Sequence, residues 1–132
     1  MLEYVTSRIK EKFNIDTVNI TLEELYEVLN NVDINKDKKL AKTWSLSACK
    51  IVETSNDDLV NSAKLTIAIS SLVEKYEADA MALACFKLLH DIGTTGCMAL
   101  STINDSLDCV ASCEGDIDSA ITLLLAKCVS DK

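Results

Sequence analysis

The clearest structural unit of this sequence comes near its end, where a strand pattern, a turn and a helix pattern follow one another. Residues 108–113 (DCVASC) alternate as a half-buried strand does, and residues 114–116 (EGD) then turn the chain. Asp116 stands where a helix N-cap is expected. In the helix that follows, apolar residues recur at helical spacing: Ile117, Ile121, Leu124, Leu125 and Cys128. We expect these five side chains to form its buried stripe.

Two more strands are expected upstream. Residues 79–85 (DAMALAC) form an apolar run short enough for a buried parallel strand, and residues 16–20 (DTVNI) are rich in β-branched side chains. Residues 98–105 fit either a helix or a strand, and the polar residues 33–39 are expected to be a linker. Helical periodicity predicts five further helices, over residues 2–13, 22–32, 40–55, 56–76 and 86–91.

The order of these elements predicts the fold class. Strands alternating with helices favour right-handed crossovers and a parallel sheet. We therefore expect an α/β fold: an open, mostly parallel sheet of about three to four strands with helices on both faces, similar to a Rossmann fold. The 132 residues are the usual size of one domain, and 48% of them are hydrophobic, enough to form a core.

Charge and cysteine content exclude several classes of function. The formal charge is -8, and no Lys/Arg cluster offers a surface for phosphate backbones, so nucleic-acid binding is not expected. No apolar stretch approaches the ~20 residues that a membrane span needs. We expect a cytoplasmic protein with reduced thiols, of which Cys49, Cys85 and Cys128 lie in the core. Because His90 is the one histidine, a multi-histidine zinc site is excluded.

In open parallel sheets, ligands bind beyond the carboxyl ends of the strands, which here indicates residues 85–88, the 93–96 loop (GTTG) and above all the 114–116 turn. A carboxylate such as Glu114 can be held rigidly there and can bind a metal ion. The alternative is that Glu114 and Asp116 only cap the helix and complement its dipole. Similarly, Gly93, Thr94 and Thr95 can bind an anion through backbone N–H groups or form a simple turn.

Residues 79–126, a little over a third of the chain, contain a series of short motifs in this order: an apolar strand ending in Cys-Phe, a Gly-Thr-Thr loop, Ala-Leu-Ser with Asn-Asp, and Ala-Ser-Cys-Glu-Gly-Asp before an apolar helix. In these motifs the segment resembles the central domain of the L-fucose isomerase family. The Cys-Glu-Gly-Asp turn is the most specific of them.

The resemblance implies a function for these residues. It makes Glu114 a ligand of a divalent metal, usually Mn²⁺, and a residue that moves a proton between C1 and C2 of a small sugar in an aldose-ketose isomerisation. Gly93, Thr94, Thr95, Asn104 and Asp116 become candidates for the substrate-binding loops. The family's aspartate and histidine ligands would follow Lys132. We therefore expect a fragment of a longer, homo-oligomeric enzyme that is inactive as the isolated chain.

Two alternatives remain open. The chain could be a stand-alone, non-catalytic module that binds a small metabolite or a partner subunit through the glycine loop and the acidic strand end. It could also be an assembly domain, because the edges of a small sheet need to be covered.

Overall fold

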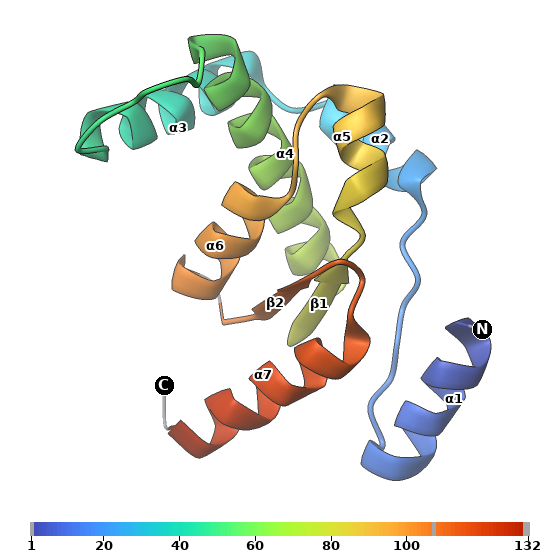
Figure 1. Ribbon diagram of the computed structural model, residues 1–132. Coiled ribbons are helices and arrows are strands. Elements are labelled where there is room, and N and C mark those ends of the chain that lie inside the picture. The colour runs from blue at the N-terminus through green and yellow to red at the C-terminus, as the bar shows by residue number, and fades with distance from the viewer. Residues whose placement is uncertain (1, 107, 131–132) are drawn as a thin grey trace.

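The computed structural model describes residues 2–106 and 108–130, which contain seven helices and one two-stranded parallel sheet (Figure 1). The elements are, in chain order, α1 (Leu2–Phe13), α2 (Leu22–Asn30), α3 (Ile34–Ser47), α4 (Asn56–Lys75), β1 (Ala80–Leu83), α5 (Cys85–Ile92), α6 (Cys97–Ser106), β2 (Val110–Cys113) and α7 (Ile117–Ser130). Within the described residues, no helix is both long enough and apolar enough to cross a membrane.

The expected open α/β sheet of three to four strands is wrong, because the protein is mostly helical. β1 and β2 pair in parallel, with Ala80 opposite Val110 and Leu83 opposite Cys113. The expected strand over residues 16–20 is instead an unpaired connection between α1 and α2, in which Val18 is 62% exposed. Its β-branched residues favour extended backbone, but a strand also needs a neighbour with which to pair.

The expected linker over residues 33–39 is also wrong. Asp33 is the N-cap of α3, and its side chain accepts a hydrogen bond from the backbone N–H of Asn35 at 2.9 Å. The polar composition of this segment reflects the start of a helix. The helix ends at Ser47, well before residue 55, and Ile51 and Val52 are exposed in the irregular segment beyond it.

Helix α4 is the centre of the hydrophobic core. Its N-terminus carries a capping box between Ser55 and Asp58, and its buried side chains surround much of the helix. Helices α2, α3 and α6 all pack against it. The fully buried side chains Leu65, Leu88 and Ile103 come from α4, α5 and α6, so the core joins segments far apart in the chain.

The sheet lies between α7 on one face and the α4–α6 core on the other (Figure 1). Of the stripe expected on α7, Ile117, Ile121 and Leu124 are half-buried, whereas Leu125 and Cys128 are exposed. The expectation was wrong for those two residues because α7 packs against a sheet of only two strands. A wider sheet would cover a broader face of the helix.

Candidate functional site

The two strands end at the same edge of the sheet, and the chain makes a bulge there. The N–H of Val110 donates to the carbonyl of Asp79, and the N–H of Gly115 donates to that of Leu83, both at 3.0 Å. The acceptors are four residues apart but the donors are five apart, so β2 contains one extra residue at its end. Glu114 and Gly115 accommodate it with left-handed backbone, at φ 62° and 66°.

Glu114 is exposed on this bulge, and none of the described residues forms a hydrogen bond or an ion pair with its carboxylate. Its carboxylate is therefore accessible, as the predicted role as a ligand requires. However, no three His, Cys, Asp or Glu side chains in residues 2–106 and 108–130 come together in a group that could hold a metal ion. Mn²⁺ takes about six ligands, so the described residues do not fit a Mn²⁺ site.

Asp116 caps α7. The N–H and the hydroxyl of Ser119 donate to its two carboxylate oxygens, at 3.0 and 2.6 Å. These hydrogen bonds hold the pKa of Asp116 below its ordinary value, because they stabilise the ionised form. The capping role expected of Asp116 is therefore confirmed, and its role toward a substrate stays a prediction.

The glycine loop packs into the protein. Gly93 ends α5 in left-handed backbone, at φ 68°. The buried hydroxyl of Thr94 lies 2.9 Å from that of Ser62 on α4, and Thr95 donates to the thiol of Cys97 at 3.3 Å. Gly96 lies so close to β1 that an added Cβ would be 2.2 Å from Cδ2 of Leu83. Both threonine hydroxyls thus have partners within the protein.

Asn104 lies away from the strand ends. Its side-chain amide on α6 hydrogen-bonds both the N–H and the carbonyl of Ala111, in the middle of β2. The fold therefore brings Glu114 and Asp116 together, with the glycine loop packed behind β1. It does not bring Asn104 to this end of the sheet.

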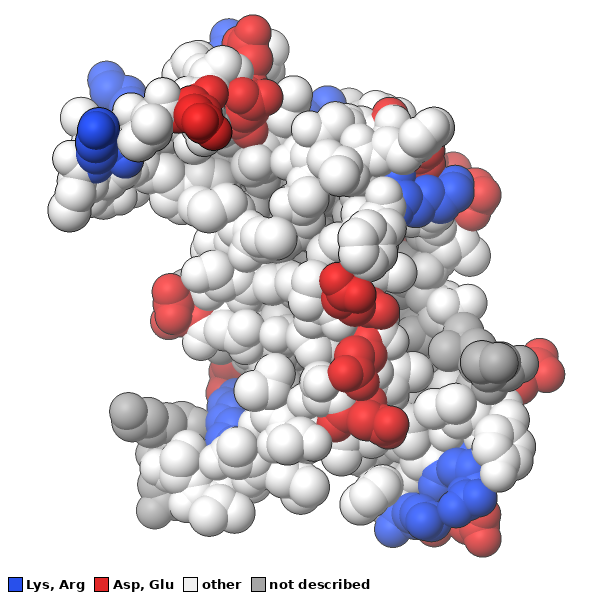
Figure 2. All heavy atoms as spheres, in the orientation of Figure 1, with Lys and Arg blue, Asp and Glu red and all other residues white. Residues whose placement is uncertain are grey.

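Acidic side chains gather over the turn between β2 and α7 and the start of that helix (Figure 2). Glu114, Asp116 and Asp118 are the exposed acidic residues of this segment. Such a surface attracts cations and repels anions such as phosphate groups.

Two hollows of the surface lie elsewhere. One, of about 390 Å³, is lined by residues of α2, α3 and α4 that include Glu27, Lys36 and Ser71. The other, of about 220 Å³, lies at the amino ends of the strands and is lined by Asp79 and Asp108 among others. Neither hollow is lined by any of the predicted site residues.

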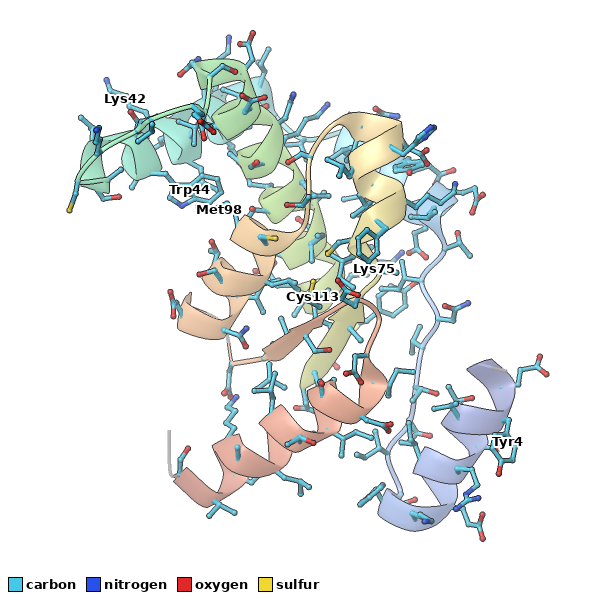
Figure 3. The ribbon with its side chains drawn as sticks, in the orientation of Figure 1. Tyr4, Lys42, Trp44, Lys75, Met98 and Cys113 are labelled. Atoms are coloured by element: carbon cyan, nitrogen blue, oxygen red, sulfur yellow. The ribbon has the colours of Figure 1, made fainter. Side chains whose placement is uncertain are left out.

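The sequence interpretation placed Cys85 at this end of the sheet but missed that it lies against Cys113. Sγ of Cys85, at the start of α5, lies 3.5 Å from Sγ of Cys113, at the end of β2, which Figure 3 labels. A signal was present, because each cysteine ends a segment that was expected to be a strand of the sheet. Of the three cysteines expected in the core only Cys85 is buried, whereas Cys49 and Cys128 are exposed.

No family model matches this chain, and comparison with curated proteins and with solved structures also gives no match. The resemblance to the L-fucose isomerase family and the activity that it implies therefore remain predictions.

Proposed function

We propose that this chain is a non-catalytic assembly module that pairs with a second copy of itself through the outer edge of β1. The observation that carries this proposal is that the outer edge of β1 has backbone groups without a partner among the described residues. The peptide groups of Asp79 and Leu83 face β2, so those of Ala80 and Ala82 face the opposite side. No strand of the described chain lies there, and none of its residues hydrogen-bonds these groups.

The edge is self-complementary. In an antiparallel pair of β1 strands with the twofold axis at Met81, Ala80 of one copy is opposite Ala82 of the other. Each such pair exchanges two N–H to C=O hydrogen bonds. The strand AMAL carries no charge, so its pairing with a second copy places no like charges opposite each other. The partner is therefore a second copy bound about a twofold axis.

Exposed apolar side chains on α7 support the same proposal. Helix α7 packs against both strands, yet Leu123, Leu125 and Val129 on it are 40%, 54% and 85% exposed. Leu125 and Val129, four residues apart, share one face of the helix, and exposed apolar side chains that adjoin one another mark interaction surfaces. A second copy bound along β1 would bring a second α7 close to this surface.

The test is the mass of the native protein by light scattering, for the wild-type chain and for Ala82→Pro. Proline removes one outward N–H and leaves the bonds between β1 and β2 in place. We expect a dimer for the wild type and a monomer for the variant. Val18→Pro, in the unpaired connection before α2, is the matched control and should stay dimeric. A monomeric wild type at all accessible concentrations would contradict the proposal.

A second candidate is the function implied by the resemblance: a domain of a metal-dependent sugar isomerase that contributes Glu114. The accessible carboxylate at the carboxyl end of β2 favours it. The other metal ligands would have to come from outside the described residues. The resemblance makes the enzyme an intramolecular oxidoreductase that acts on a small sugar, with Glu114 holding or moving the proton.

This candidate is tested on the protein isolated from its source cells with an antibody against the chain. A polypeptide several times heavier than 14.4 kDa that interconverts an aldose and a ketose only with Mn²⁺ would support it. Glu114→Gln should then abolish turnover, whereas Glu77→Gln, also at positive φ, should not. A polypeptide of 14.4 kDa without this activity would contradict it.

We also propose a cytoplasmic location. All six cysteines are free thiols, which reducing compartments maintain. Fractionation of source cells tests this, and recovery of the protein from an oxidising compartment would contradict it.

A further inference from the structure

We propose that Cys85 and Cys113 form a thiol-oxidation site, at which peroxide converts the two thiols into a reversible intramolecular disulfide. Their sulfur atoms are 3.5 Å apart. The strand register places Cys113 opposite Leu83, and Cys85 follows two residues later, so the backbone of the sheet holds the two cysteines side by side. This site is independent of the assembly proposed above.

The other thiols of the chain lack such a partner. Cys49, Cys97, Cys109 and Cys128 all lie in the described residues, and none has its sulfur within hydrogen-bonding distance of another cysteine sulfur. Cys109 directly precedes β2, at the opposite end of the strand from Cys113. Six cysteines allow fifteen different pairs, and oxidation of the folded chain should therefore link only Cys85 to Cys113.

The two thiols differ in access. Cys113 is exposed, whereas Cys85 is buried at 7% exposure beneath it. Burial raises the pKa of Cys85, and the neighbouring Cys113 thiol raises it further. Peroxide therefore reaches Cys113 first, and Cys85 stays a protonated thiol until it meets the oxidised sulfur.

The chemistry balances with hydrogen peroxide as the oxidant. The Cys113 thiol first releases its proton to solvent, and its thiolate attacks one peroxide oxygen. The O–O bond breaks to give a sulfenic acid and a hydroxide, which takes up the released proton to become water. The sulfur of Cys85 then attacks the sulfur of Cys113. The S–S bond forms as the S–O bond breaks, and the oxygen leaves as a second water with the proton of the Cys85 thiol. Two thiols and one peroxide thus give one disulfide and two waters.

The surroundings permit this closure. The sulfur atoms must approach from 3.5 Å to about 2.05 Å. Gly96 packs directly against Cys85, where an added Cβ would lie 3.0 Å from its Sγ, so the missing side chain leaves room. Cys113 is next to Glu114 on the bulge, so the bond would tie the start of α5 to the turn that carries the exposed carboxylate.

The experiment treats the native full chain with hydrogen peroxide and maps disulfides without reduction. Trypsin and an endoproteinase that cleaves before aspartate place Cys85 in residues 79–87, Cys97 in 91–104 and Cys113 in 108–115. We expect peptides 79–87 and 108–115 to be linked, and dithiothreitol to separate them. Peptide 108–115 also holds Cys109, so Cys109→Ser must retain the link.

Single-cysteine substitutions test separately the role of Cys113, which reacts with peroxide, and that of Cys85, which closes the disulfide. Cys113→Ser should abolish the link, and Cys85→Ala should leave a sulfenic acid on Cys113 that dimedone traps. Cys97→Ser and Cys128→Ser are matched controls that should still form the bond. Circular dichroism checks that each variant folds. A link between Cys85 and any other cysteine, or peroxide-treated wild type without a link, would overturn the proposal.

Discussion

The side-chain amide of Asn104 pairs with Ala111 as a neighbouring strand would. Its Nδ2 donates to the carbonyl of Ala111, and its Oδ1 accepts from the N–H of Ala111, both at 2.9 Å. The N–H and the carbonyl of Ala111 point away from β1, so the side chain of Asn104 on α6 covers the centre of the outer edge of β2. β2 is thus paired on both sides, and β1 on one.

Replacing Asn104 by leucine should destabilise the fold. The change leaves the N–H and the carbonyl of buried Ala111 without partners, and each such loss costs about 1–3 kcal/mol. We expect the free energy of unfolding in urea to fall by at least about 2 kcal/mol. Asn61→Leu, on the exposed face of α4, is the control and should change it by less than about 0.5 kcal/mol. Equal effects of the two variants would contradict the pairing role.

Stability should depend on acid pH through Asp91. Hydrogen bonds from Tyr26 first, and then from His90 and Lys87, lower the pKa of Asp91 from 3.8 to about 2. Because the folded-state pKa lies below the unfolded one, Asp91 stabilises the fold above pH 3.8, and this contribution disappears as the pH falls to about 2.

Tyr26→Phe removes the largest of these effects, the hydrogen bond of 2.7 Å between α2 and Asp91. We expect the pKa of Asp91, measured by NMR titration, to rise toward 3.8. The stability difference from wild type should shrink as the pH falls to about 2. Tyr4→Phe is the control, because Tyr4 bonds Arg8 and no carboxylate. An unchanged Asp91 titration in Tyr26→Phe would contradict the proposed cause.

The two acidic residues of the turn should respond differently to substitution. Asp116→Ala removes the cap of α7 and should lower the free energy of unfolding by about 1 kcal/mol. Glu114→Gln should leave the unfolding transition in place, because no described residue bonds that carboxylate. Thermal melts of both variants make the comparison. A large loss in Glu114→Gln would mean that the carboxylate is structural.

Substitutions of Thr94 and Thr95 should also differ in their effect on stability. Thr94→Val takes away the partner of the half-buried Ser62 hydroxyl and places a methyl group against it, so we expect a loss of about 1–3 kcal/mol. Thr95→Val loses only a weak hydrogen bond to Cys97 and should cost less than about 0.5 kcal/mol. Urea unfolding of the two variants provides the test. Similar losses in the free energy of unfolding would show that the contact of Thr94 with Ser62 stabilises the fold no more than that of Thr95 with Cys97.

Local patterns identified most of the elements. Periodicity placed α1, α2, α4, α5 and α7 close to their observed bounds, and the alternation of residues 108–113 contains β2. The Asp116 cap was also predictable, because a capping hydrogen bond joins residues three apart. The same reasoning failed at residues 16–20, where a strand pattern lacks a neighbouring strand, and at residues 33–39, where helix-capping polarity resembles a linker.

The candidate site was also only partly predictable from the sequence. The turn at Glu114 and its exposure follow from the sequence, but the role of Asn104 does not, because a polar residue on α6 gives no sign that it covers β2. The contact between Cys85 and Cys113 required knowledge of which strands pair and in which register.

The sequence by itself determined the approximate bounds of α1, α2, α4, α5 and α7 and the turn before α7, because capping and periodicity act over a few residues. Only the tertiary structure decided how many strands pair. A strand ladder joins distant segments, and α4 with α6 occupies one face of the sheet while the side chain of Asn104 takes the edge position of a third strand. That competition between a helix side chain and a strand for the same backbone groups is settled in three dimensions, and at this edge it leaves β2 with β1 as its one neighbouring strand among the described residues.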